Sequence, residues 1–175
     1  MPAIGQPAPP FALPDTEGAL HEPGAAPATV VVFTCNHCPY ALAWHERLVA
    51  VARDYAALGV RMLAINPNDA ERYPGDSPEA MAARVRAGEF DGVPYLRDES
   101  QGVARAYDAK TTPDVFLLDA QGVLRYRGAP DGDYDDPGQN AAYLRDALDA
   151  VLAGREPDPS ETTPVGCSIK WRVGG

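Results

Sequence analysis

Three short runs of consecutive apolar residues dominate the hydrophobic pattern of this 175-residue chain. They are Val30 to Phe33, Met62 to Ile65 and Val115 to Leu118, and polar residues flank each of them. Strands that are apolar at every position, rather than at every second one, are typical of strands with both faces covered. The pattern therefore predicts an α/β fold with a central, mostly parallel sheet buried between helices.

Four segments between and after these runs have the apolar spacing of helices. The first spans Tyr40 to Leu58, where apolar residues recur every three or four positions, and Gly59 supplies a stop signal. The other predicted helices span Pro78 to Ala87, Gln101 to Tyr107 and Gln139 to Leu152.

The ends of the chain differ from this central pattern. Residues 1–28 are rich in proline and glycine, and the turn signal at residues 14–18 predicts a small N-terminal β-hairpin. A second turn at residues 119–122 leads into residues 124–127, which alternate in polarity as an antiparallel strand near a sheet edge would. Residues from about 155 to 175 form a C-terminal tail, and we expect residues 1–175 to form one domain.

Composition narrows the classes of function. The net charge is −10, which argues against nucleic acids and anionic membrane surfaces as partners. The chain is 45% hydrophobic and 23% charged, and no apolar run approaches the roughly 20 residues of a membrane span. Because the first residues lack the features of a targeting segment, we expect a cytoplasmic protein. In that reducing compartment, three cysteines favour a reactive or metal-binding pair over structural disulfides.

Residues 35–38 form a Cys-x-x-Cys motif between the first apolar run and the first predicted helix. Two thiols at this spacing can close a disulfide within one helical turn, so the motif indicates redox chemistry. Unpaired N–H groups and the helix dipole stabilise an anion at a helix N-terminus, and His37, if protonated, would add to the effect. We therefore expect a lowered pKa at Cys35, the attacking thiolate at the exposed end, and an inward-facing resolving thiol at Cys38.

A third cysteine, Cys167, lies in the C-terminal tail. It can be a further thiol that returns to the Cys35 site, either as an alternative resolving cysteine or as a relay for disulfides. It can also be a small buried residue in the packing of the tail, which is the interpretation that we favour.

The same residues leave a non-enzymatic alternative open, a site for zinc or copper. Cys35, His37 and Cys38, with Cys167 as a fourth ligand, carry suitable donor atoms. Three of these ligands crowd one helical turn, so we rank this alternative below redox chemistry and expect no metal and no cofactor.

Four segments of the sequence together indicate a protein family. They are residues 33–40, residues 112–117, the arginine-bearing hairpin that follows, and residues 166–171. In this order and spacing they resemble a thioredoxin-like, peroxiredoxin-like branch of the alkyl hydroperoxide reductase and thiol-specific antioxidant group. The resemblance implies a central mixed β-sheet flanked by helices and a Cys35/Cys38 redox pair. It also implies a cis peptide bond between Thr112 and Pro113 that faces this pair.

The motif departs from its relatives in two ways. Thr34 stands where ordinary thioredoxins carry tryptophan, and the dipeptide Asn36-His37 replaces glycine and proline between the cysteines. Because that dipeptide tunes the thiol pKa and the reduction potential, we expect a more oxidising protein than a general reductant. Peroxiredoxins carry a P-x-x-x-T-x-x-C pattern, whereas here Thr34 is adjacent to Cys35 and the run before it contains no such proline.

These observations predict a thiol-disulfide oxidoreductase in which Cys35 attacks, Cys38 resolves, and the backbone beside Pro113 docks the substrate. Its partners would be disulfides and thiols of proteins or small molecules, with thioredoxin or glutathione as the reducing partner. The alternative is a peroxiredoxin-like thiol peroxidase with antioxidant activity. In that case Cys35 is oxidised to sulfenic acid and Cys38 or Cys167 condenses with it.

Overall fold

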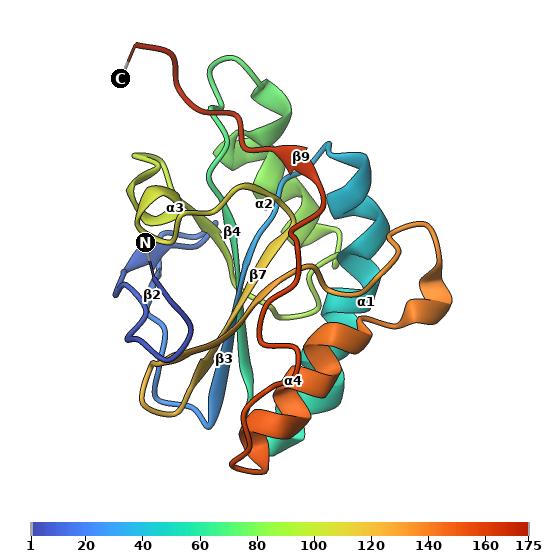
Figure 1. The fold of residues 1–175 in the computed structure, drawn as a ribbon. Coiled ribbons are helices and arrows are strands. Elements are labelled where there is room, and N and C mark those ends of the chain that lie inside the picture. Colours follow the sequence, from blue (N-terminus) through green and yellow to red (C-terminus); the bar gives the residue numbers. More distant parts are fainter. Residues whose placement is uncertain (1, 175) are drawn as a thin grey trace.

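Five strands form the central sheet of the computed structural model, which describes residues 2–174 (Figure 1). In sheet order the strands are β5 (Tyr95–Arg97), β4 (Arg61–Asn66), β3 (Ala28–Phe33), β7 (Asp114–Asp119) and β8 (Leu124–Gly128). β3 runs parallel to β4 and β4 parallel to β5, whereas β7 is antiparallel to β3, and β8 is antiparallel to β7. The sheet is therefore mixed, as the family resemblance implied.

The prediction of a mostly parallel sheet is wrong for the third apolar run. Val115 to Leu118 lies in β7, where Phe116 faces Val31 of β3 in antiparallel register. All six residues of β7 are buried, because neighbouring strands flank it and both faces of the sheet are covered. An antiparallel strand in this position is as continuously apolar as a parallel one, so the run alone does not give the strand direction.

Helices and the N-terminal hairpin cover the two faces of the sheet (Figure 1). α1 (Pro39–Tyr55) and α4 (Ala142–Leu152) pack on one face, against Val30 and Val32 of β3. The other face carries Val31 and Phe33, and it is covered by residues of α3 (Gly102–Ala106) and of the N-terminal segment. Successive side chains of β3 thus enter opposite cores.

All four predicted helices are present, with small shifts of their ends. α1 is followed by the 3₁₀ turn Ala56–Leu58, and this turn ends at Gly59, which adopts a left-handed φ of 84°. α2 (Pro78–Arg86) packs against residues of β4 and β5. α4 begins later than predicted, because the 3₁₀ turn Pro137–Gln139 precedes it.

Both ends of the chain are ordered against this core. The predicted hairpin is formed by β1 (Leu13–Pro14) and β2 (Leu20–His21). The C-terminal tail first follows the outer edge of β8, where the N–H of Thr162 donates to the carbonyl of Arg127. It then reaches the start of α1, where β9 (Cys167–Ser168) pairs antiparallel with β6 (Thr111–Thr112) (Figure 1).

Among residues 2–174, none of the helices combines the length and the apolar character that a membrane crossing requires.

Candidate active site

The turn from β3 into α1 positions both cysteines of the motif. Thr34 is buried and extends the strand by one residue, since its N–H donates to the carbonyl of Ile65 at 2.8 Å. Cys38 is the N-cap of α1, and Pro39 occupies the first helical position, where its missing N–H has no intrahelical partner to lose. The two cysteines therefore bracket the junction of strand and helix, as the sequence predicted.

The prediction that Cys35 lies at an exposed end is wrong. Cys35 and Cys38 are each only 1% exposed, and they form one buried cluster with Ala41. Tyr40 and Cys167 pack against this cluster, so residues from α1 and from the tail contribute to its cover. With the tail in this position, a large substrate has no direct path to either sulfur.

Thr112 lies across both thiols. The peptide bond between Thr112 and Pro113 is cis, as the resemblance implied. The hydroxyl of Thr112 is 3.3 Å from the sulfur of Cys35, and its carbonyl accepts a hydrogen bond from the Cys38 thiol at 3.2 Å. The fold thus brings three residues of the predicted site, Cys35, Cys38 and Thr112, into contact.

Asp76 fixes the dipeptide between the cysteines. Its Oδ1 accepts a hydrogen bond from the N–H of Asn36 at 2.7 Å, and its Oδ2 lies 2.8 Å from Nδ1 of His37. Asn66, the last residue of β4, and Asn68, in the segment after it, donate to the same carboxylate at 3.0 Å each. The side chain of Asp76 is fully buried, whereas that of His37 is 42% exposed and stacks on Tyr73.

The amide of Asn36 completes this network. Its oxygen accepts hydrogen bonds from Tyr95 at 2.6 Å and from Arg84 at 2.9 Å, and its nitrogen donates to the carbonyl of Gly75. Burial raises the pKa of Tyr95, so this hydroxyl stays a donor. The dipeptide is therefore held rigidly by side chains from α2, β5 and the turn before α2.

Sequence reasoning missed Asp76, Arg84 and Tyr95. Asp76 stands in a proline- and glycine-containing turn just before Ser77, the N-cap of α2. An acidic residue near a helix N-terminus is ordinary, so nothing in the local pattern marks it as part of the site.

Hydrogen bonding between the two thiols separates their ionisations. It lowers the pKa of Cys38 to about 4, and contacts with Cys167 contribute to the fall. The same hydrogen bond raises the pKa of Cys35 far above its ordinary value, and burial adds to the rise. This direction is opposite to the one that the helix N-terminus predicted for Cys35.

The two contacts with Thr112 favour the opposite distribution of the proton, with a thiolate at Cys35 and a thiol at Cys38. A hydroxyl can donate to a thiolate at Cys35, and a carbonyl acceptor favours a protonated thiol at Cys38. We conclude that the reduced pair shares one proton and carries one negative charge at neutral pH, which belongs to the pair as a unit.

Cys167 returns to the redox pair, as one of its two interpretations proposed. It faces Thr112 across the β6–β9 ladder and packs against the cluster of Cys35, Cys38 and Ala41. Burial and this contact with Cys38 raise the pKa of Cys167 to about 11. Unlike the other two cysteines, Cys167 keeps intermediate exposure.

One group among residues 2–174 brings three possible metal ligands together, namely Cys35, His37 and Asp76, whose ligand atoms lie within 4.8 Å of one another. This set differs from the one considered from the sequence, because Asp76 takes the place of Cys38 and Cys167. Thiolate, imidazole and carboxylate donors suit zinc. A metal here would replace the hydrogen bond between His37 and Asp76.

Comparison with known proteins places this site in a family context. The model of the AhpC/TSA family matches residues 4–127, which include the Cys-x-x-Cys motif and Pro113. The solved structure of an uncharacterised conserved protein from Geobacillus kaustophilus is similar over all of this chain and 95% of its own, with 41% identity and a TM-score of 0.92.

Two more distant matches are thiol:disulfide interchange proteins by name. DsbE from Allochromatium vinosum is 28% identical over 137 residues, which span 72% of this chain and 66% of that protein, slightly under two thirds of its length. A Chlorobium tepidum structure provisionally described as DsbE has 22% identity and a TM-score of 0.68, and covers 87% of this chain and 99% of its own. This second likeness shows a common thioredoxin-like fold.

Proposed function

The chain belongs to the AhpC/TSA family, and from this premise we propose that it is a thiol-disulfide oxidoreductase with Cys35 and Cys38 as its redox pair. The observation that carries the proposal is the contact of Thr112 with both sulfurs, through its hydroxyl to Cys35 and its carbonyl to Cys38. Both thiols lie in one buried cluster against the same residue, which supports their pairing in a disulfide.

The proposed reaction has two exchange steps. With the shared proton on Cys38, the Cys35 thiolate attacks a substrate disulfide, forms a mixed disulfide and displaces one substrate sulfur, which takes up the proton of Cys38. The Cys38 thiolate then attacks Cys35 in the mixed disulfide, releases the second substrate sulfur and leaves the Cys35–Cys38 disulfide. The hydroxyl of Thr112 supports the first step because it can donate to the Cys35 thiolate. The reverse sequence oxidises a substrate dithiol.

Substrate docking at Thr112 requires β9 to move. In thiol-disulfide exchange of this kind we propose that an extended substrate segment pairs with the backbone beside Pro113. That edge is occupied by β9, where Cys167 faces Thr112. We therefore propose that release of the tail precedes the attack by Cys35.

The partners belong to the proposal as well. We propose protein or small-molecule disulfides as substrates, because exchange at sulfur needs no further group at the site. Thioredoxin or glutathione would be the reducing partner of a protein located in the cytoplasm. The Allochromatium vinosum relative is a thiol:disulfide interchange protein by name, which supports this class of substrate.

A redox titration tests the proposed function. The protein is equilibrated with glutathione buffers of increasing oxidised fraction, quenched with acid and alkylated, and its disulfides are mapped by mass spectrometry. We expect a Cys35–Cys38 disulfide that forms in one two-electron step, at a potential above the roughly −270 mV of thioredoxin. Absence of this disulfide at every glutathione ratio would contradict the proposal.

A further inference from the structure

The C-terminal tail gathers a third sulfur at the redox pair. Cys167 packs against the buried cluster that contains both cysteines of the motif, and it faces Thr112, which contacts both of their sulfurs. The pKa of Cys167 is influenced by Cys38, and the pKa of Cys38 is influenced by both Cys35 and Cys167. The three thiols therefore form a chain with Cys38 in the middle.

The close approach of the tail depends on a glycine. A Cβ atom at Gly166 would lie 2.4 Å from the carbonyl oxygen of Thr112, a separation that such atoms do not tolerate. Gly166 does not have a left-handed φ, so the requirement is for space rather than for conformation. The residue before Cys167 thus lets the tail backbone lie directly against the strand that touches both sulfurs.

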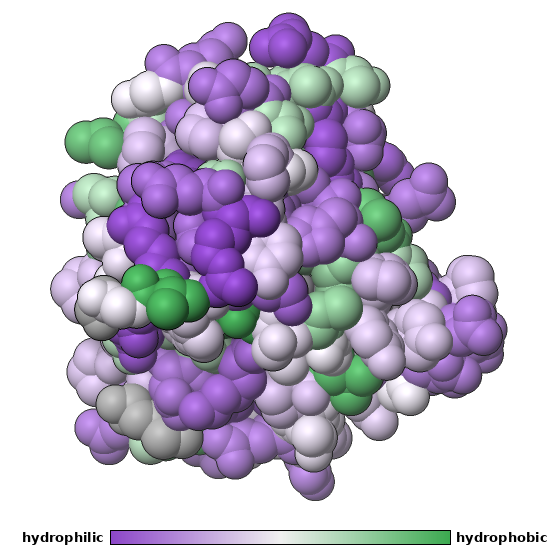
Figure 2. All heavy atoms as spheres, turned by 90° about the horizontal axis from the view of Figure 1, so that it is seen from above, coloured by the Kyte–Doolittle hydropathy of each residue, from purple (hydrophilic) through white to green (hydrophobic). Residues whose placement is uncertain are grey.

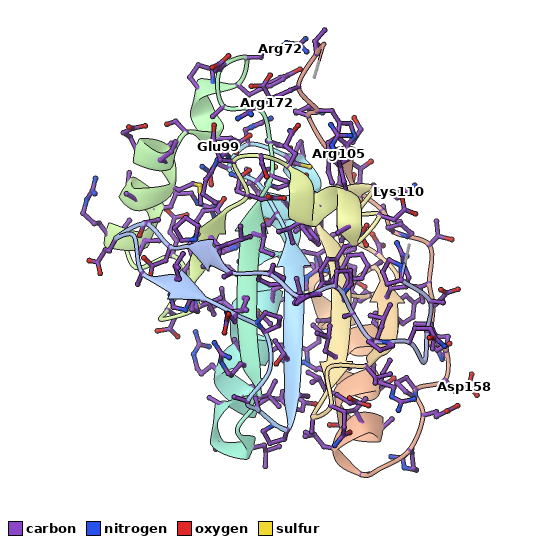
Figure 3. The ribbon with its side chains drawn as sticks, turned by 90° about the vertical axis from the view of Figure 1, so that its left-hand side faces the viewer. Arg72, Glu99, Arg105, Lys110, Asp158 and Arg172 are labelled. Atoms are coloured by element: carbon purple, nitrogen blue, oxygen red, sulfur yellow. The ribbon has the colours of Figure 1, made fainter. Side chains whose placement is uncertain are left out.

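Residues after Cys167 hold the tail in register. The N–H of Ile169 donates to the carbonyl of Lys110, and the N–H of Lys170 donates to Oδ1 of Asn68 at 2.9 Å. Arg105 lies over the ring of Trp171 at 4.6 Å, and Arg172 pairs with Glu99. Arg105, Arg172 and Glu99 lie in the upper part of Figure 3, where the tail ends. These contacts fix the position of the Cys167 sulfur.

Exposure distinguishes the three thiols. Cys35 and Cys38 are 1% exposed, whereas Cys167 has intermediate exposure. While β9 is paired with β6, Cys167 is the thiol of the three that a partner in solution can approach.

We propose that Cys167 is a second resolving cysteine, which exchanges with Cys38 and presents the disulfide to the reducing partner. This inference rests on the proposed function, because it requires that Cys35 and Cys38 first form a disulfide. Cys35 then serves the substrate when the tail is released, and Cys167 serves the reducing partner when the tail is in place.

The exchange conserves atoms and electrons. The thiolate of Cys167 attacks the sulfur of Cys38, the Cys35–Cys38 bond breaks, and Cys35 leaves as a thiolate that takes up the proton lost by Cys167. No external oxidant or reductant is consumed in this step. A new disulfide, between Cys38 and Cys167, replaces the buried one.

Reduction by the partner follows at the more exposed sulfur. A thiolate of a dithiol partner attacks Cys167, the Cys38–Cys167 bond breaks, and Cys38 leaves as a thiolate. A lowered pKa makes Cys38 a good leaving group. The second thiol of the partner then attacks the partner sulfur that is bonded to Cys167. This step releases Cys167 as a thiol, regenerates the reduced protein and leaves the partner with an internal disulfide.

Pairwise cysteine variants test this inference. Cys35→Ser and Cys38→Ser are oxidised with equal, limiting diamide, and their disulfides are mapped by mass spectrometry without reduction. We expect Cys35→Ser to form Cys38–Cys167 at least tenfold faster than Cys38→Ser forms Cys35–Cys167, because Cys38 is the neighbour of Cys167. Equal rates, or no Cys38–Cys167 disulfide where the wild type forms Cys35–Cys38, would overturn the inference and leave the proposed function intact. If the wild type forms no Cys35–Cys38 disulfide, the proposed function fails as well.

A second measurement follows the reducing partner. Oxidised Cys167→Ser, which keeps the motif pair, is mixed with reduced thioredoxin, and we expect its disulfide to be reduced at least tenfold more slowly than that of the wild type. The matched control is the double variant Cys167→Ser/Ser168→Cys, which moves the thiol to the adjacent residue of β9 and hence to the opposite side of the strand. We expect the reduction rate of this double variant to stay as low as that of Cys167→Ser. An unchanged rate in Cys167→Ser, or full recovery in the control, would overturn the inference.

Discussion

Asp76 accepts hydrogen bonds from four residues at a fully buried position, and two of those residues form the dipeptide between the cysteines. A carboxylate in this position satisfies the backbone N–H of Asn36 directly. It also adds negative charge beside Cys35, which contributes to the raised pKa of that thiol. Asp76 is thus both a structural and an electrostatic neighbour of the redox pair.

Removal of this carboxylate should destabilise the fold. In Asp76→Ala the N–H of Asn36 and the amides of Asn66 and Asn68 lose their acceptor. We expect a loss of roughly 3 kcal/mol in the free energy of unfolding, because buried donors stay unsatisfied. Urea denaturation measures the change. The control Arg53→Ala removes an exposed ion pair with Asp91 and should cost about 0.5 kcal/mol or less; a similar loss in both variants would contradict this role of Asp76.

The shared proton predicts the pH dependence of the reduced protein. Since the pKa of Cys38 is lowered to about 4 and that of Cys35 is raised, one thiolate should be present from below pH 7 up to alkaline pH. The lowered pKa stabilises the folded state fully above the ordinary thiol pKa of about 9, and this contribution is lost as the pH falls through 4. The raised pKa of Cys35 acts in the opposite sense above pH 9, where the unfolded thiol ionises and the folded one does not.

Ultraviolet absorbance of the thiolate during a pH titration measures these ionisations. In Cys35→Ala the thiol that donates to the Cys38 anion is removed, so we expect the remaining pKa of Cys38 to rise toward its ordinary value. The oxidised protein is the control, because a Cys35–Cys38 disulfide removes both titrating groups. Two thiolates that appear together near pH 9 in the reduced protein would contradict the shared proton.

At the residue scale, the sequence located the reactive groups but not their surroundings. The spacing of Cys35 and Cys38 and the residues Thr112 and Pro113 are visible in the chain, and the fold brings them together. The raised pKa of Cys35 could not be predicted, because it depends on the hydrogen bond with Cys38, on burial in the folded chain and, to a smaller extent, on a carboxylate far away in the sequence. The electrostatic effect of the helix N-terminus alone predicted a lowered pKa for Cys35, which is the wrong direction.

At the scale of elements, the pairing of β9 with β6 controls access to the site. β9 has only two residues, yet it lies on the edge that we propose for substrate docking. Its backbone can approach Thr112 this closely because Gly166 has no side chain. The exposure of Cys35 and Cys38 should therefore depend on the close contact between Gly166 and Thr112.

Gly166→Ala should detach this strand. The added methyl group would lie 2.4 Å from the carbonyl oxygen of Thr112, so we expect β9 to shift away. The expected cost is about 1–3 kcal/mol in unfolding free energy, as for other overpacked sites. Alkylation of Cys35 and Cys38 by iodoacetamide should become at least tenfold faster, as mass spectrometry of the modified peptides would show.

The matched control for this variant is Ser168→Ala in the same strand, where the side chain is exposed and adds no atom toward β6. Its alkylation rates should equal those of the wild type. If Gly166→Ala leaves the two thiols as protected as before, β9 does not control their access.

Element patterns in the sequence predicted the helices and the central strands better than the sheet directions. Continuous apolar runs identify β3, β4 and β7, since each is buried on both faces. They do not reveal that β7 is antiparallel, and they do not reveal β5, whose three residues are too short for a pattern. The position of β9 follows from contacts over the whole fold, which no local periodicity encodes.

At the scale of the whole molecule, the redox pair lies at the end of the sheet where α1 begins and the tail returns (Figure 1). Figure 2 shows the molecule from that side as a mainly hydrophilic surface, with apolar residues in small, scattered patches. Of the larger apolar residues near the site, Leu42 and Val165 are exposed. We therefore expect that the proposed substrates are recognised at this face mostly through polar and backbone contacts.

The residues before Cys35 argue against peroxide reduction. Peroxiredoxins carry a P-x-x-x-T-x-x-C pattern ahead of the peroxidatic cysteine, whereas here Thr34 is adjacent to Cys35 and the run before it contains no such proline. We expect hydrogen peroxide to oxidise the reduced protein no faster than a free thiol of similar pKa, while a disulfide reagent oxidises it readily. Stopped-flow measurements of intrinsic fluorescence compare the two oxidants, with Cys35→Ser as the control. Oxidation by peroxide that is orders of magnitude faster than for a free thiol, and that is lost in Cys35→Ser, would identify a thiol peroxidase instead.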